Sequence, residues 1–240
     1  MLWVDKHRPS SLDELTYHDS VTERLRALAS NPASLPHLFF YGPSGAGKRT
    51  RVLSLLKELF GKGALKLKLD KRTFTTPTKK TVDINMISSN YHIEICPADA
   101  GLNDRFVIQE VIKEMASNKS IHTAMPTMSA GATTNNDNSN NNSGDGPSGA
   151  AAPSAGFKVV ILSEVDRLSK QAQAALRRTM ERYAQTCRLI LVSSSAAKVM
   201  EPVRSRCLGI RIGAPTAEQV SSDDGTTMAR VMLYVSVNLY

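Results

Sequence analysis

The hydrophobic positions of this chain fall into two alternating kinds of segment. Short, mostly apolar runs occupy residues 38–41, 91–95, 158–162, 188–192 and 208–212. Runs of this length with little polar alternation are typical of strands that are buried on both faces of a parallel sheet. Segments with helical spacing lie between them, and strands that alternate with helices predict an α/β fold built on a five-stranded parallel sheet flanked by helices.

The intervening segments carry helix and hairpin signals of their own. A capping box at residues 20–23 predicts the start of one helix, and Ser169 is expected to cap another. The second helix has one apolar face and one basic face, and the basic residues are Arg177, Arg178 and Arg182. Residues 65–84 alternate between polar and apolar positions, which predicts short strands or a hairpin inserted after the first core helix.

Two stretches show neither kind of periodicity. Residues 124–156 contain no Lys or Arg and are rich in Asn, Ser, Gly and Ala, so they bury too little apolar area to offset the entropy of ordering. We predict a disordered surface insertion there. Residues 221–240 form an atypical C-terminal tail, of which residues 231–240 are typical of an aggregation-prone strand. The predicted organisation is one domain over residues 1–220, interrupted by the insertion and followed by the tail.

The main chemical motif is a glycine-rich turn between the first predicted strand and a helix. In this context the turn predicts a phosphate-binding loop, because glycines let successive backbone N–H groups point inward at a polyphosphate. The positive end of the helix adds to this field, and Lys48 can reach the outer phosphates. An ordinary glycine-rich turn is the alternative. The residues expected to bind a nucleotide are Gly42, Pro43, Ser44, Gly45, Ala46, Gly47, Lys48, Arg49 and Thr50.

Two positions differ from those of a nucleotide hydrolase. The residue after the lysine usually carries a hydroxyl that helps to hold Mg²⁺, and here it is Arg49. The strand that ends at Leu162 should present an aspartate for Mg²⁺ and then an acid that activates water, but Ser163 and Glu164 follow it. Asp166 is interpreted as a structural residue that caps the next turn. Because hard cations prefer charged oxygens, this degenerate acidic motif predicts a nucleotide site without its usual Mg²⁺ contacts and without turnover.

Charge and cysteine content narrow the class of protein further. The formal net charge is +8, and residues 47–80 contain eleven Lys or Arg against two acidic residues. Such a segment suits the phosphates of a nucleic acid, although a solvated basic face explains the charge equally well. The three cysteines have no metal-ligand spacing, which suits a reducing intracellular compartment. No apolar run reaches the length of a membrane span.

The combined motifs resemble the small subunits of replication factor C, an AAA+ clamp loader that opens a ring-shaped sliding clamp and closes it on primed DNA. The resemblance covers residues 1–220 except the insertion, and it is carried by residues 3–9, 42–50, 163–166, 175–183 and 205–207. Within this family the pattern is most similar to the type called subunit 3. Its phosphate loop also has a basic residue after the lysine, and its acidic motif also lacks the first aspartate.

The resemblance implies roles for residues at both ends of the domain. Val4, Arg8 and Pro9 would line the adenine side of an ATP or ADP site, where His7 replaces the more usual tyrosine. Arg206 would be an arginine finger that is inserted into a neighbouring subunit's ATP site. A guanidinium is a permanent, planar donor suited to developing phosphoryl charge. From spacing alone, Arg206 would be a surface ion-pair partner.

The remaining implications concern DNA, sensing and assembly. Arg177 and Arg178 resemble a basic helix on the DNA side, and Ser194 stands at a sensor position that is usually Asn. The implied partners are the other subunits of a hetero-pentamer, the sliding clamp and the phosphates of primed double-stranded DNA. The implied compartment is the nucleus. Family members continue into a helical lid and a collar domain, which are not recognisable after residue 220, and truncation is one hypothesis for this.

Three functions are therefore compatible with the sequence. The favoured one is a nucleotide-binding subunit of a clamp loader that does not hydrolyse its own nucleotide and supplies Arg206 to a neighbour. The second is an autonomous ATPase with an unusual metal site. The third is a truncated fragment that is unable to join the ring.

Overall fold

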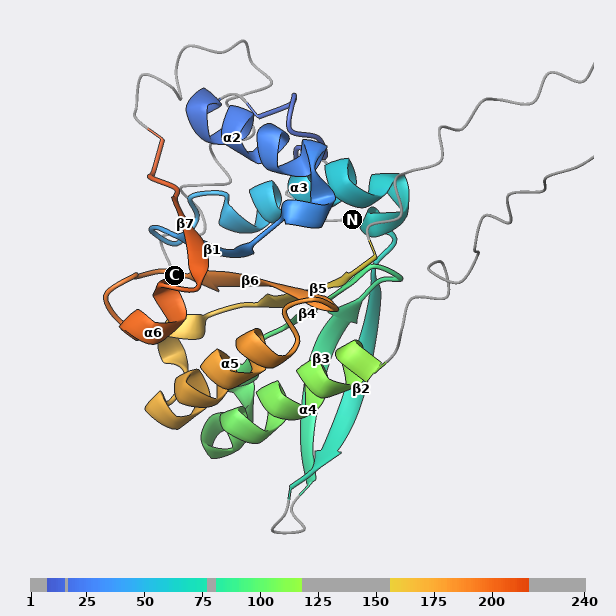
Figure 1. Ribbon diagram of the computed structural model, residues 1–240, viewed down its shortest axis with the longest axis vertical. Coiled ribbons are helices and arrows are strands. Elements are labelled where there is room, and N and C mark those ends of the chain that lie inside the picture. Colours follow the sequence, from blue (N-terminus) through green and yellow to red (C-terminus); the bar gives the residue numbers. More distant parts are fainter. Residues whose placement is uncertain (1–7, 16, 77–80, 118–155, 216–240) are drawn as a thin grey trace, which may run out of the picture.

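The structure, a computed structural model, describes residues 8–15, 17–76, 81–117 and 156–215. Within these ranges a seven-stranded sheet of order β2-β3-β4-β5-β6-β1-β7 lies between two layers of helices (Figure 1). The five predicted strands are all present and run parallel to one another. They are β4 (His92–Ile95), β5 (Lys158–Leu162), β6 (Cys187–Ser193), β1 (His37–Tyr41) and β7 (Cys207–Arg211).

The other two strands are the predicted hairpin, and they extend the sheet. β2 (Lys68–Thr75) pairs antiparallel with β3 (Thr81–Ser88), and β3 pairs antiparallel with β4. The prediction of a five-stranded sheet is therefore right for the parallel part and two strands short for the whole. Alternation indicates that two strands lie half-buried, but it does not show that β3 has a second partner.

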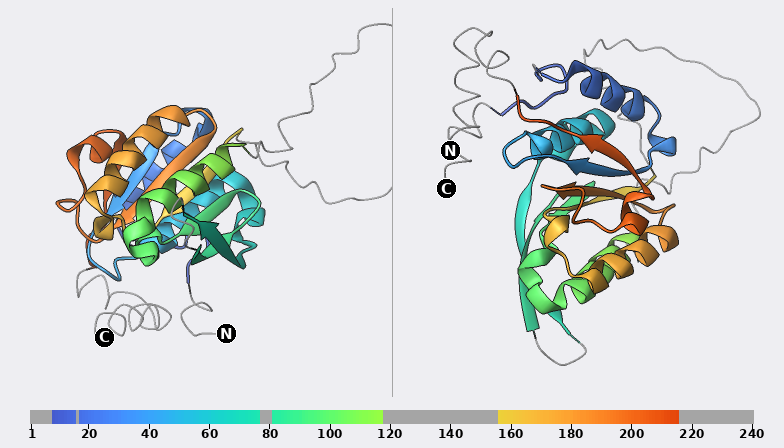
Figure 2. Two further views of the ribbon diagram at one scale, coloured as in Figure 1. Left: turned by 90° about the horizontal axis from the view of Figure 1, so that it is seen from below. Right: turned by 90° about the vertical axis from the view of Figure 1, so that its left-hand side faces the viewer.

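Helices cover both faces of the sheet (Figure 2). One layer consists of α2 (Asp19–Ser30) and α3 (Lys48–Phe60), and the other of α4 (Asp104–Ser117) and α5 (Lys170–Arg182). Each layer buries its own apolar cluster against the sheet. The short elements are α6 (Glu201–Arg204), η1 (Pro32–Ser34), η2 (Gly61–Leu65), η3 (Pro97–Asn103) and η5 (Val165–Arg167). Because the inner strands are covered on both sides, they tolerate uninterrupted apolar sequence.

The helix starts agree only in part with the predicted caps. Ser169 does cap α5, since its hydroxyl oxygen accepts a hydrogen bond from the Ala172 backbone N–H at 3.1 Å. The capping box at residues 20–23 is wrong, because α2 begins before it, with His18 as the cap residue in a left-handed backbone conformation (φ 59°). His18 Nε2 lies 3.2 Å from the carbonyl oxygen of Gly213. The cap residue of this helix is therefore also engaged in a contact between distant segments, which the local sequence does not reveal.

Several expectations lie outside the described residues. These are the adenine-side position of Val4, residues 124–155 of the insertion and the whole tail from residue 221 to residue 240. The division into one domain and a tail remains a prediction. Among the helices in the described ranges, none combines the length and apolar character that a membrane crossing needs.

Candidate functional site

The parallel strands bring the predicted nucleotide chemistry to one edge of the sheet. Residues 42–50 follow β1, Ser163 follows β5 and Ser194 follows β6. β6 lies between β5 and β1 and is parallel to both, with Tyr41 of β1 paired to Ser193. The three segments therefore share the carboxyl edge, where ligands bind in open α/β sheets.

Close packing holds the glycine-rich loop in a curled conformation. A Cβ atom on Gly42 (φ 150°) would lie 1.8 Å from the carbonyl oxygen of Ile212, and one on Gly47 (φ 73°) would lie 2.5 Å from Tyr17 Oη. Both positions therefore require glycine, because neither the backbone angle nor the space suits a side chain. The Tyr17 hydroxyl donates a 3.4 Å hydrogen bond to the Ala46 carbonyl, which ties the N-terminal segment to the loop.

Lys48 begins α3 and folds back over the loop. Its Nζ donates hydrogen bonds to the carbonyl oxygens of Gly42 and Pro43, both at 2.7 Å. Burial lowers the pKa of Lys48, and the charge of Asp166 opposes that shift. The ammonium is thus held at the N-terminus of a helix, a place that favours an anion such as a phosphate group.

Arg49 forms a forked ion pair with Glu94 of β4. Nε of Arg49 lies 2.8 Å from Oε1 of Glu94, and Nη2 lies 2.9 Å from Oε2. The Glu94 side chain is only 10% exposed, whereas that of Arg49 is 42% exposed. The hydroxyl of Ser163 also lies 3.5 Å from Glu94 Oε1. The two residues that stand at the usual Mg²⁺ positions therefore meet at one buried carboxylate.

Glu94 is the residue of this group that the motifs do not reveal. All four residues of β4 are buried, and glutamate is rarely buried unless it is paired. A glutamate inside a short core strand was the available signal. His92 lies two positions earlier, and burial lowers its pKa to about 4, against the opposing charge of Glu94. The histidine is therefore neutral near pH 7, and the charge of Glu94 is matched by Arg49.

The two acidic residues of the degenerate motif, Glu164 and Asp166, both have partners within the chain. Glu164, with φ 54°, pairs with Arg167 at 2.5 Å. Asp166 accepts hydrogen bonds from the hydroxyls of Ser193 (3.0 Å) and Ser194 (2.6 Å) and from the Ser194 backbone N–H (3.2 Å). Asp166 thus has a structural contact but does not cap η5, whose cap residue is Glu164. It joins the acidic motif to the predicted sensor position.

Arg8, one of the residues expected on the adenine side, lies beside the first turn of α3. Arg8 Nη1 donates a 3.3 Å hydrogen bond to Thr50 Oγ1 in the first turn of α3. Arg8, the adjacent Pro9 and Thr50 are all partly buried. The structure thereby brings together the described members of the predicted nucleotide site from the N-terminus and the loop.

Arg206 lies at the amino end of the parallel strands, whereas the phosphate loop lies at their carboxyl end. It directly precedes β7, where Cys207 pairs with His37 at the start of β1, whereas Arg211 pairs with Tyr41 at the end of β1. The phosphate loop follows that end. At a rise of about 3.3 Å per residue, the length of the strand places the backbone of Arg206 roughly 15 Å from the chain's own loop.

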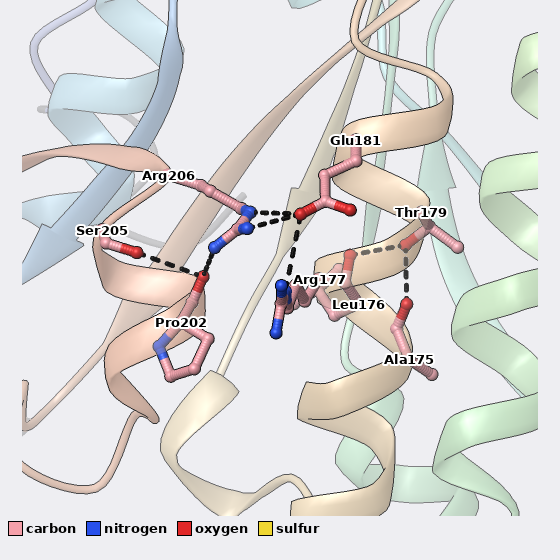
Figure 3. A network of polar contacts seen from close by, with 8 residues as sticks. All are labelled: Ala175, Leu176, Arg177, Thr179, Glu181, Pro202, Ser205 and Arg206. Carbon is pink, nitrogen blue, oxygen red and sulfur yellow. Dashed lines mark hydrogen bonds and ion pairs between the residues drawn. The ribbon is translucent and has the colours of Figure 1, made fainter.

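Figure 3 shows the guanidinium of Arg206 among oxygen acceptors of its own chain. Its Nε donates to Oε1 of Glu181 at 2.8 Å, and its Nη1 donates to the carbonyl oxygen of Pro202 at 2.7 Å. Arg177 approaches the same oxygen of Glu181 from within α5, at 3.4 Å. The hydrogen bond from Arg206 is the main reason that the pKa of Glu181 is lowered. Arg177 is thus brought beside Arg206, and Arg178 is exposed on the same helix.

Comparisons with known proteins decide the family. Residues 149–216 match the family model described as DNA polymerase III, delta subunit. Over 221 residues, 92% of the chain, the sequence is 49% identical to the probable replication factor C subunit 3 of Dictyostelium discoideum and 46% identical to replication factor C subunit 3 of Mus musculus. This chain belongs to the replication factor C family. It spans about half of these relatives, namely 55% and 54% of their lengths.

The replication factor C resemblance found in the motifs is thereby confirmed, and so is the AAA+ fold. The RuvB Holliday junction branch migration motor of Thermotoga maritima superposes with a TM-score of 0.50 at 14% sequence identity. The match covers 96% of this chain and 55% of the RuvB chain. At that identity the likeness concerns the fold alone. The residue roles implied by the replication factor C family, including the sensor at Ser194, remain predictions.

A pH-dependent contribution to stability is expected from Asp166. Burial raises the pKa of its carboxyl, but the hydrogen bonds from Ser194 and Ser193 outweigh this and leave the pKa below the ordinary value. A lowered folded-state pKa contributes stability above the unfolded pKa, about 4, and loses it as the pH falls through the folded value. Asp166→Asn should cost about 1 kcal/mol at pH 7, since solvent screens this half-buried group.

The measurement is the midpoint of thermal unfolding of both proteins between neutral and acid pH. The difference between them should be constant above about pH 5 and shrink below pH 4. A difference that persists undiminished in acid would show that the shape of the side chain matters and its ionisation does not.

Proposed function

We propose that this chain is a nucleotide-binding subunit of a replication factor C clamp loader, that it does not hydrolyse its own nucleotide, and that it lends Arg206 to a neighbouring subunit. The observation that carries the proposal is the contact of Arg49 and Ser163 with Glu94. Where a hydrolase uses a hydroxyl and a carboxylate to hold Mg²⁺, this chain has a guanidinium and a hydroxyl that bind a buried carboxylate.

The loop geometry supports the binding half of the proposal. The ligand would be ATP or ADP, held by the backbone N–H groups of residues 42–50 and by the Lys48 ammonium. Lys48 at present donates to two loop carbonyls, so a phosphate group would replace acceptors that are already close to it. Arg8 and Pro9, beside the first turn of α3, would face the adenine end.

The position of Arg206 supports the assembly half. It lies at the end of the parallel strands opposite to the chain's own loop, which supports supply to a different subunit rather than a role at its own phosphates. The proposed partners are the other subunits of a hetero-pentamer, the sliding clamp and the phosphates of primed double-stranded DNA, in the nucleus. Arg177 and the exposed Arg178 are the proposed contacts on the DNA side.

The deciding experiment compares nucleotide retention with turnover. Purified chain is mixed with ATP, and bound nucleotide and released phosphate are both quantified, with Lys48→Ala as the background. The expected result is stoichiometric retention in the unmodified chain and phosphate release no faster than in the variant. Steady release that Lys48→Ala abolishes would instead identify an autonomous ATPase.

Assembly is tested separately by co-expression with the sister subunits. Recovery of this chain in a complex that loads the clamp on primed DNA is the expected outcome. Nucleotide binding without any recovery of the sister subunits would leave the pocket intact and refute the clamp-loader role.

A further inference from the structure

The carboxylates on the acidic side of the pocket are bound by donors of the chain itself. The donors are Arg49 for Glu94, Arg167 for Glu164, and Ser193 and Ser194 for Asp166. Mg²⁺ demands close oxygen ligands in near-octahedral geometry and dehydrates reluctantly. A cation at these carboxylates would compete with donors that are already bound to them.

The Glu94 position fits a divalent cation least of all. Both of its oxygens are engaged by the Arg49 fork, at 2.8 Å and 2.9 Å, and planar bidentate pairing of this kind is among the strongest hydrogen-bonded contacts. A Mg²⁺ ion on Glu94 would also sit against a permanent positive charge, and the repulsion is large in a partly buried site. The residues present therefore do not fit the metal.

The same contact provides a cation of the chain's own. Because Glu94 is nearly buried, it needs a partner, and removing that partner would leave an uncompensated charge. Arg49 is therefore held in the first turn of α3, next to Lys48 and at the positive end of the helix. The pair uses Nε and Nη2, and Nη1 lies outside it on a side chain that is 42% exposed.

We infer that the Arg49–Glu94 pair takes the place of Mg²⁺ in this pocket, so that the chain binds the phosphates of ATP or ADP as the metal-free nucleotide. The inference rests on the proposed nucleotide-binding function and specifies the form of its ligand. Glu94 is a positioning residue in this scheme, since it fixes the guanidinium and does not itself meet the phosphates.

The test is a titration of the full chain with N-methylanthraniloyl-ADP, once in EDTA and once in millimolar MgCl₂. The expected Kd in EDTA is no weaker than in MgCl₂ by more than about threefold. A Kd that is more than about tenfold tighter in MgCl₂ overturns the inference and leaves nucleotide binding in place. Absence of binding under both conditions would overturn the proposed function together with the inference.

The double variant Arg49→Thr/Ser163→Asp restores the hydroxyl and the carboxylate that Mg²⁺ uses elsewhere. It should become metal-dependent, with Kd at least about tenfold tighter in MgCl₂ than in EDTA. A metal effect no larger than in the unmodified chain would contradict the inference. Arg72→Ala is the matched control, because Arg72 forms an ion pair with Glu114 at a similar exposure, 39%, on the hairpin strand β2. It should bind like the unmodified chain in both buffers.

A further variant covers the case in which the double variant does not fold. Arg49→Lys keeps the positive charge and loses the fork. It should weaken binding in EDTA by up to about tenfold without creating any preference for MgCl₂. Metal-dependent binding by Arg49→Lys would show that the fork is not what excludes the cation.

Discussion

Replacing Arg206 with alanine should lower ATP turnover at the neighbouring subunit's site by on the order of 10³-fold, while this chain's own nucleotide affinity stays within about twofold. The large effect follows from the proposed role, because an arginine finger supplied in trans stabilises charge that develops on the transferred phosphoryl group. The chain's own nucleotide affinity should change little because Arg206 precedes β7 at the start of β1, whereas the loop follows the end of β1.

The intrachain contacts of Arg206 do not stand against this role. Its pair with Glu181 is 29% exposed on the arginine side and 49% on the glutamate side, and solvent-screened pairs of this kind contribute little to stability. A phosphate oxygen can therefore replace the carboxylate at little cost.

The measurement needs a complex in which the neighbouring site alone retains its loop lysine, so that all turnover reports on that site. Arg204→Ala is the control, because it removes another arginine of the same turn, one that pairs with Glu201. It should retain most of the activity. If Arg206→Ala weakened nucleotide binding to this chain and spared the neighbour, the assignment in trans would be wrong.

The parts of the fold that sequence predicts are those fixed by local pattern. Apolar runs identify the five parallel strands because each is covered on both faces, and the loop of residues 42–50 is recognisable because its glycines are required at fixed spacings. The placement of Ser163 and Ser194 at one edge then follows from strand direction alone. The cap at Ser169 was predictable because its contact is local and spans only three residues.

The parts that sequence misses depend on contacts between distant segments. Glu94 meets Arg49 across 45 positions, and neither residue alone indicates the other. The cap residue of α2, His18, contacts Gly213, 195 positions away, and the local capping box carries no sign of that contact. The pairing of β3 with β4 is local and is missed for another reason, because alternation carries no information on which strand edge is covered.

Replacing Lys48 with alanine should weaken nucleotide binding by on the order of 100-fold. Charge-assisted hydrogen bonds are worth about 1.5–3 kcal/mol each, and 1.4 kcal/mol corresponds to tenfold in Kd. Without Mg²⁺ contacts, fewer other cations share the phosphate charge, so this loss should be larger than the loss from removing Arg49. The affinity is measured with N-methylanthraniloyl-ADP in EDTA.

Lys57→Ala is the matched control for this change. Lys57 lies in the same helix α3 and donates a 2.8 Å hydrogen bond to Ser10 Oγ, remote from the loop glycines. It should bind nucleotide as the unmodified chain does, whereas Lys48→Arg should recover part of the affinity, because it restores the charge with a different shape. Equal losses in Lys48→Ala and Lys57→Ala would mean that the helix had been disturbed. Unchanged binding in Lys48→Ala would mean that the loop after β1 does not hold the phosphates.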